Sequence, residues 1–384
     1  MKSWKLSLSI ILPLFLCSLC ACAGNEPAPV SPTVEASPTG SESAEASIET
    51  TTQATAEPAE QSSTQQSIQE EDNMTIENTT PVSIHGALSV QGADLVDKNG
   101  EKFQLYGMST HGIAWFPQYV NQEAFRTLRD DWNTNCVRLA MYTEEYGGYC
   151  SDGDKETLKA LVKNGVEYAS ELGMYVIIDW HILSEQDPNV HKDEAITFFR
   201  EMSSAYADYE NVLYEICNEP NGYATWDSVK AYASEVIPVI RENDSDAVIL
   251  VGSPTWSQDI DKAQASPLEF DNIMYTLHFY AATHKDDLRS RLEGCVNQGL
   301  PVFVSEFGMC DASGNGGNDF EQTEEWLTLI EKYNISFLCW NLANKAESSS
   351  VFLPSSTAIS DWAEEDLNES GKWIREYFRS IEQP

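Results

Sequence analysis

The sequence predicts an α/β fold: a closed (β/α)8 barrel of the TIM type. Eight short β-rich runs follow residue 100, longer amphipathic stretches separate them, and chemically active side chains end several of the runs. The alternation alone also fits an open, doubly wound sheet. The polar residues favour the barrel, because the carboxyl ends of all its strands meet on one face, where such enzymes carry their sites.

The predicted strands and helices follow from the spacing of apolar residues. Short runs rich in β-branched and aromatic residues predict strands, and an apolar repeat of about 3.6 residues predicts amphipathic helices. The predicted strands are residues 103–107, 136–141, 175–179, 212–216, 248–251, 273–277, 302–305 and 337–340. Helices are expected at residues 156–172, 227–242, 285–298, 320–333 and 369–381.

The amino terminus, residues 1–22, predicts an export signal. Lys2 and Lys5 precede an apolar run over residues 6–19, which is too short to cross a bilayer comfortably. The ending Leu19-Cys20-Ala21-Cys22 resembles a bacterial lipobox, which predicts a lipid on Cys22. Ordinary cleavage after Ala23 is the alternative. We therefore expect an extracellular protein tethered to the membrane through Cys22.

Residues 23–84 predict a disordered acidic linker. They contain eleven acidic residues, no lysine or arginine and no aromatic residue, so they cannot bury enough apolar surface to fold. The catalytic barrel is then expected over residues 85–384. The whole chain carries a formal charge of −38, which excludes general nucleic-acid binding because phosphates would be repelled.

Six of the nine cysteines lie in the predicted barrel, and they give no metal or disulfide pattern. There is no Cys-x-x-Cys pair and no Cys/His spacing of a metal site after residue 85. Cys136, Cys217 and Cys339 lie inside apolar runs, where we expect them to be small buried side chains. Export permits disulfides, but the sequence does not determine which cysteines pair, so we assign no disulfide bond.

Two glutamates indicate the chemistry. Glu219 follows the fourth predicted strand and Glu306 the seventh, so both lie at the mouth of a barrel. Cleavage of a glycosidic bond needs such a pair, since one carboxyl group protonates the departing oxygen while the other attacks or activates water.

The motifs Asn218-Glu219-Pro220 and Ser305-Glu306-Phe307-Gly308, in order with other polar strand ends, resemble glycoside hydrolase family 5 and its bacterial endo-β-1,4-glucanases. The resemblance covers essentially all of residues 85–384. It implies a retaining double displacement on a β-glucan polysaccharide by a monomer that needs no metal or organic cofactor. From the amino-terminal sequence, we expect contact with membrane only through the lipid on Cys22.

The resemblance assigns the catalytic roles. Glu219 is the acid/base and Glu306 the nucleophile, with carboxyl groups about 5–5.5 Å apart in a retaining enzyme. Asn218 matches the residue that binds the sugar 2-hydroxyl. Arg138 can neutralise and orient the nucleophile, and Tyr280 can donate a hydrogen bond to it. The remaining two residues, His181 and His278, are expected to form a polar network around the pair.

Substrate binding is assigned to residues with flat rings or polar ends, because the apolar face of a pyranose stacks on an aromatic ring. The resemblance implies glycone-side binding by His111, Trp115, Tyr142 and Trp340, and leaving-group-side binding by Trp256, Gln258 and His284. Lys345 and Glu347 resemble residues that hydrogen-bond distal glucose hydroxyls. Trp132, Trp326 and Trp373 lie in helical patterns, so we assign them to packing.

Three alternatives stay open. The Asp179-x-His181 pair with His278 could indicate a metal-dependent hydrolase, although the first strand lacks the His-x-His of such a centre. A non-catalytic glycan-binding protein could keep the tryptophans but would not need both glutamates. Within the family, a mannanase, lichenase or xyloglucanase would use the same chemistry on another polysaccharide.

Overall fold

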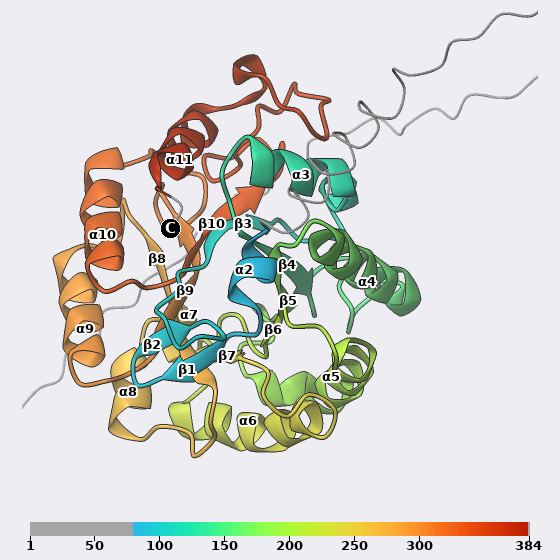
Figure 1. The fold of residues 1–384 in the computed structure, drawn as a ribbon, viewed down its shortest axis with the longest axis vertical. Coiled ribbons are helices and arrows are strands. Elements are labelled where there is room, and N and C mark those ends of the chain that lie inside the picture. The colour runs from blue at the N-terminus through green and yellow to red at the C-terminus, as the bar shows by residue number, and fades with distance from the viewer. Residues whose placement is uncertain (1–79, 383–384) are drawn as a thin grey trace, which may run out of the picture. The chain divides into compact units, whose positions relative to one another are not determined.

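The computed structural model describes residues 80–382, which form a closed barrel of eight parallel strands (Figure 1). Each strand pairs in parallel with the next in the chain, and the last pairs with the first. The strands are β3 (Tyr106–Thr110), β4 (Cys136–Tyr142), β5 (Tyr175–His181), β6 (Val212–Glu215), β7 (Ile249–Val251), β8 (Ile273–Tyr280), β9 (Val302–Gly308) and β10 (Phe337–Leu342). The predicted (β/α)8 fold class is confirmed.

Helices surround the barrel, and those predicted from the sequence begin and end within two residues of the expected positions. Their apolar faces pack on the strands in one large buried cluster. The α-helices after β3 are α3 (Gln122–Asp130), α4 (Lys155–Glu171), α5 (Lys192–Tyr206), α6 (Trp226–Arg241), α7 (Pro254–Ser257), α8 (Ile260–Ala265), α9 (Asp286–Val296), α10 (Phe320–Lys332) and α11 (Glu369–Ser380). Three short 3-10 helices are η1 (Pro117–Tyr119), η2 (Pro188–His191) and η3 (Glu364–Asp366).

The first barrel strand lies three residues later than predicted. The sequence analysis placed it at residues 103–107, but β3 spans Tyr106–Thr110. Phe103 and Leu105 precede the strand and pack into a buried apolar cluster at the amino end of the barrel, which explains their apolar character. The ring of Phe103 lies 5.6 Å from that of Tyr175 on β5.

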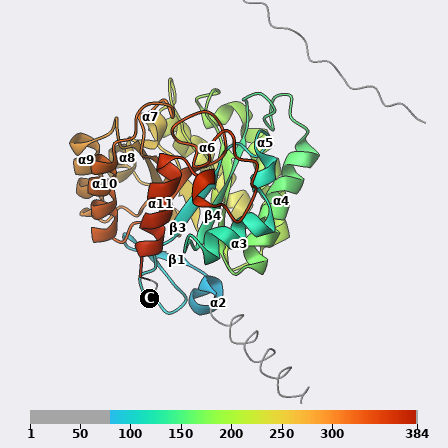
Figure 2. The same cartoon turned by 90° about the horizontal axis from the view of Figure 1, so that it is seen from above.

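An antiparallel hairpin closes the amino end of the barrel. Its strands are β1 (Ser89–Gln91) and β2 (Asp94–Val96), and Leu88 and Leu95 from this segment join the same apolar cluster. Figure 2 shows β1 and α2 (Pro81–His85) at one end of the barrel and α7, which follows the carboxyl end of β7, at the other. The other end of the barrel is therefore left for polar residues.

Helix α2 (Pro81–His85) overlaps the predicted linker, so its boundary at residue 84 is wrong by several residues. The Thr80 side chain accepts a hydrogen bond from Ser83 N and caps the helix, and Val82 N donates to the Gly173 carbonyl at 3.1 Å. Thr80 followed by Pro81 is a typical start of a helix. This signal was overlooked because residues 23–84 as a whole have the composition of a disordered segment. The predicted signal peptide, Cys22 and the rest of the linker lie outside the described residues.

The buried cysteines and tryptophans agree with the sequence analysis. Cys136, Cys217 and Cys339 are fully buried, and the six cysteines of the described part form no disulfide. Trp132 and Trp326 are also fully buried, whereas Trp373 is half-buried and stacks on Phe320 and Tyr377.

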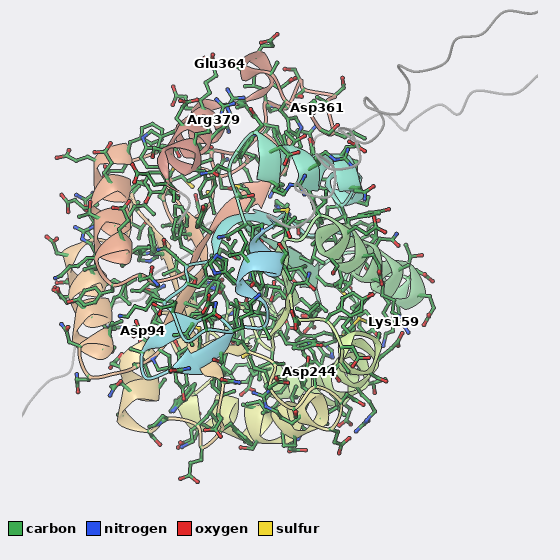
Figure 3. The ribbon with its side chains drawn as sticks, in the orientation of Figure 1. Asp94, Lys159, Asp244, Asp361, Glu364 and Arg379 are labelled. Atoms are coloured by element: carbon green, nitrogen blue, oxygen red, sulfur yellow. The ribbon has the colours of Figure 1, made fainter. Side chains whose placement is uncertain are left out.

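The outer helices and loops carry the charged surface. Lys159 on α4, Glu364 in η3 and Arg379 on α11 lie at the periphery of the molecule (Figure 3). Between residues 80 and 382, no helix is both long enough and apolar enough to cross a membrane.

Candidate active site

A cavity of about 770 Å³ lies at the carboxyl ends of the strands. Fourteen of the sixteen residues predicted for catalysis and substrate binding line it, and Arg138 and Asn218 lie buried outside the lining. The lining residues that the sequence predicted are His111, Trp115, Tyr142, His181, Glu219, Trp256, Gln258, His278, Tyr280, His284, Glu306, Trp340, Lys345 and Glu347.

The two predicted catalytic glutamates face each other in this cavity. Glu306 lies on β9 and Glu219 in the loop after β6, and they are 4% and 9% exposed. A carboxylate oxygen of each lies within 4.8 Å of the other and of a ring nitrogen of His278. This short separation fits the carboxyl spacing of a retaining glycosidase, in which the nucleophile attacks the sugar directly.

Glu306 is held by two hydrogen-bond donors. Arg138 Nη1 donates to Oε2 at 3.2 Å, and the Tyr280 hydroxyl donates to Oε1 at 2.8 Å. Burial and the nearby carboxylates raise the pKa of Tyr280 well above its usual value, so its proton stays in place. Both contacts favour the negatively charged form of Glu306.

Arg138 is fully buried and pairs with three carboxylates. Its Nε donates to Glu215 at 2.8 Å, and its Nη2 lies 3.0 Å from Asp179. Burial favours the neutral form of Glu215, but Arg138 and His278 outweigh it and hold the pKa of Glu215 at about 2. Glu215 was not among the site residues predicted from the sequence. The signal in the sequence that could have indicated Glu215 was its position as an ionisable residue inside an apolar strand.

His278 lies between the acid/base and a buried hydroxyl. Its Nδ1 lies 2.9 Å from Glu219 Oε1, and its Nε2 lies 2.9 Å from Ser305 Oγ. Burial favours the neutral imidazole, but hydrogen bonds and charge from Glu215 and Glu219 raise the pKa of His278 to about 9.

His181 is the neutral histidine of the network. Its Nδ1 lies 2.6 Å from Asp179 Oδ2, and burial together with the Arg138 charge lowers the pKa of His181 to about 3. Burial also raises the pKa of Asp179. The structure thus places both histidines in the expected polar network, with their pKa values shifted in opposite directions.

Asn218 contacts the network below the cavity. Its Oδ1 accepts from Arg138 Nη2 at 2.6 Å, and its Nδ2 lies 3.2 Å from His181 Nε2 and donates to the Ile182 carbonyl at 3.1 Å. At 1% exposure it does not line the cavity. Its predicted contact with a sugar 2-hydroxyl stays a prediction.

The predicted glycone side is an aromatic wall. Trp115 stacks on Tyr142 with ring centroids 4.8 Å apart, and Trp340 stacks on His181 at 5.3 Å. Lys345 and Glu347 lie beside this wall and form an ion pair at 2.6 Å. Burial opposes ionisation of Glu347, but His111 and Lys345 hold its pKa at about 2. Flat rings with charged groups at their edge suit a neutral sugar chain.

The predicted leaving-group side is carried by a strained loop. Thr255, Trp256 and Ser257 have φ angles of 60°, 52° and 54°. Such left-handed conformations cost about 1–2 kcal/mol per residue. Trp256 N donates to the Pro220 carbonyl at 3.0 Å, and Ser257 Oγ donates to the Asn218 carbonyl at 2.6 Å. These bonds hold the half-exposed Trp256 ring in the cavity wall beside the Glu219 loop.

Several lining residues carry no sequence motif, and the sequence analysis did not find them. They come from loops after the strands, whose conformation the strand pattern does not determine. They are Glu145, Leu183, Thr255, Ala312, Ser313, Gly314 and Ser349.

Comparisons with known proteins agree with this geometry. Residues 96–346 match the family model described as cellulase, glycosyl hydrolase family 5. Endoglucanase A of Butyrivibrio fibrisolvens is 48% identical over 312 residues, which span 80% of this chain and 72% of the relative. An endoglucanase of Clostridium saccharobutylicum is 45% identical over 296 residues, which span 76% of this chain and 65% of the relative.

A solved structure shares the fold closely. The catalytic domain of a Thermobifida fusca endoglucanase, solved in complex with cellotetraose, has a TM-score of 0.75 and 39% identity. The match covers 78% of this chain and 100% of that domain. Together with the paired glutamates at the mouth of the barrel, these matches show that the chain belongs to the cellulase family, glycosyl hydrolase family 5.

Proposed function

We propose that the protein is an endo-β-1,4-glucanase that hydrolyses internal bonds of cellulose and related β-glucans with retention of configuration. The observation that carries this proposal is the pair Glu219 and Glu306, facing each other within 4.8 Å in a cavity walled by aromatic rings. The names of the relatives, endoglucanases, support the reaction, and the cellotetraose bound to one of them supports the substrate class.

In the first step, Glu219 gives its proton to the glycosidic oxygen while the Glu306 carboxylate attacks the anomeric carbon. The bond between that carbon and the departing oxygen breaks, and a covalent glycosyl-enzyme forms. In the second step, Glu219 takes a proton from water, which attacks the same carbon and releases Glu306. Two inversions give net retention.

The neighbouring residues balance the charges that this cycle needs. With Glu306 ionised and Glu219 protonated at the start, the cations Arg138 and His278 match the anions Glu215 and Glu306. The Tyr280 and Arg138 donors remain on Glu306 throughout its ionised state. Because they are already in place, little reorganisation is required as charge moves during the reaction.

The wall of the cavity suits a linear glucan. The family resemblance assigns Trp340 and Trp115 to the glycone side and Trp256 to the leaving-group side, and all three line the cavity with the glutamates. Lys345 and Glu347 can hydrogen-bond glucose hydroxyls. Rings on both sides of the cleavage point allow a chain to be bound across it, as internal cleavage requires.

The test is release of reducing sugar from carboxymethylcellulose, barley β-glucan, galactomannan and xyloglucan by the full chain. We expect glucan cleavage that is lost in Glu306→Gln, and the first product seen by NMR should be the β-anomer. Cleavage of mannan or xyloglucan alone would replace the substrate and keep the mechanism. Binding without cleavage of any polysaccharide would favour a non-catalytic glycan-binding protein.

We also propose that the protein is exported and held at the membrane as a monomer by a lipid on Cys22. The support is the amino-terminal sequence, with its basic start, apolar run and Ala21-Cys22 ending. Mass spectrometry of the membrane fraction should find acylated Cys22, and Cys22→Ala should abolish the modification while Cys20→Ala keeps it. A soluble product starting at Gly24 would instead show ordinary cleavage. Light scattering of the purified protein measures its molar mass and so tests whether it is a monomer.

A further inference from the structure

Ser305 connects His278 to the buried carboxylate of Glu215. The Ser305 hydroxyl donates to Glu215 Oε1 at 2.8 Å and lies 2.9 Å from His278 Nε2. Ser305 and Glu215 are fully buried, and His278 is 1% exposed. A continuous chain of hydrogen bonds thus runs from Glu215 through Ser305 and His278 to Glu219.

The chemistry of serine fixes the proton on one side of the imidazole. A serine hydroxyl has one hydrogen, and here it points to Glu215. Ser305 must therefore accept a hydrogen bond from His278, so Nε2 carries a proton. This assignment follows from the heavy-atom positions and from the ionised carboxylate of Glu215, which can only accept hydrogen bonds.

The other ring nitrogen decides what happens to the acid/base. If Nδ1 lacks a proton, it accepts a hydrogen bond from the protonated carboxyl group of Glu219. The carboxyl proton then points to His278 and away from the substrate. If Nδ1 carries a proton, it donates to Oε1 of Glu219, and the carboxyl proton resides on the other oxygen. The second state leaves the acid free to act on the glycosidic oxygen.

The surroundings of His278 favour the second state, because negative groups outnumber positive ones. Direct contacts come from Glu219 and Ser305, and Glu215 Oε1 lies 3.7 Å from Nε2. Within the described part of the chain, the ionisable groups that act on His278 or lie beside it on its own strand are Arg138, Asp179, Glu215, Glu219, Tyr280 and Glu306.

We propose that Ser305 is a positioning residue that, together with Glu215, keeps His278 protonated on both ring nitrogens and so leaves the Glu219 proton for the leaving group. The proposal rests on the proposed function for its catalytic consequence, but the charge state of His278 can be measured without activity. Arg138 also donates to Glu215 at 2.8 and 3.2 Å, so the carboxylate keeps a partner when Ser305 is changed.

The test compares the pH profile of kcat/KM for wild type, Ser305→Ala and Ser305→Thr on a soluble β-glucan. In wild type, activity should fall on the alkaline side as the hydrogen-bonded pair of His278 and Glu219 loses a proton. Losing one hydrogen bond to a charged group should move this alkaline limb down by about one pH unit in Ser305→Ala. Ser305→Thr keeps the hydroxyl and should restore the limb. Ser253→Ala, which removes another buried hydroxyl, is the matched control and should leave the limb in place.

A second measurement follows the His278 imidazole directly by ¹⁵N NMR, with His278→Asn identifying its signals. Wild-type His278 should stay doubly protonated to about pH 9, and Ser305→Ala should lower its midpoint. A wild-type midpoint near 6.5, or an alkaline limb that Ser305→Ala does not move, would overturn the proposal. Inactivity of wild type on every polysaccharide would contradict the proposed function, whereas the NMR titration would still decide the role of Ser305.

Discussion

The two ends of the barrel are built from the same strands but hold opposite kinds of side chain. At the amino end, Cys136 on β4 and Phe303 on β9 are fully buried in an apolar cluster. Two and three residues further along these strands, Arg138 and Glu306 belong to the buried charged network. The interior thus changes from apolar to ionic within one or two layers of side chains.

This difference separates stability from chemistry. The apolar end needs its side chains only to fill space, whereas each charged group at the other end depends on the partners that surround it. A change at the apolar end should therefore alter the free energy of unfolding without altering turnover per folded molecule. A change at the charged end should alter turnover, and it should alter stability only when it leaves a charge unpaired.

The sharpest test of this contrast is Glu306→Gln, because glutamine keeps the shape of the nucleophile and removes its reactivity. We expect kcat to fall by about 10³–10⁵-fold, with oligosaccharide binding and the thermal midpoint largely retained. Turnover of β-glucan, isothermal titration with cellotetraose and calorimetry measure the three quantities. Glu324→Gln, an exposed carboxylate on α10, is the control. Turnover close to wild type in Glu306→Gln would remove this residue from the nucleophile role.

Arg138→Ala is the change at the charged end that should also cost stability. It leaves the buried carboxylates of Glu215, Asp179 and Glu306 without their shared cation. Breaking a buried ion pair from one side costs about 3–5 kcal/mol, and activity should be lost with it. Denaturant unfolding measures the cost. Arg126→Ala removes a half-exposed arginine paired with Glu123 and should cost less than about 1 kcal/mol. Equal costs in the two variants would contradict the contrast.

Leu105→Ala probes the apolar end. Leu105 is fully buried, so its truncation should lower the free energy of unfolding by about 2–5 kcal/mol through lost burial and a residual cavity. The kcat of the folded fraction should stay at the wild-type value, because the leucine does not contact the site. Ile359→Ala, at a residue that is 46% exposed, provides the control. A loss of kcat without a loss of stability would show that the two ends are coupled.

The sequence predicted those parts of the molecule that depend on local patterns. Apolar runs located the strands, and the strand ends located Glu219 and Glu306, because a closed barrel brings such ends together. The first strand was misplaced because Phe103 and Leu105 belong to the apolar cluster that fills the amino end of the barrel. Apolar character alone does not distinguish residues that fill this end from residues that pair in a barrel strand. Glu215 on β6, the partner of Arg138 on β4, was missed because the sequence does not show which side chains of different strands meet inside the barrel.

The smallest effect should be a loss of stability at alkaline pH that originates at the charged end. The pKa of His278 is raised from 6.5 to about 9 in the folded protein, chiefly by Glu215 and Glu219 acting against burial. A raised pKa stabilises the fold fully below 6.5, and this contribution, on the order of 3 kcal/mol, disappears as pH rises through about 9. Unfolding by denaturant between pH 6 and 10 should show the decline in wild type and a flatter profile in His278→Gln. The same decline in both proteins would mean that other groups, and not this imidazole, carry the alkaline dependence.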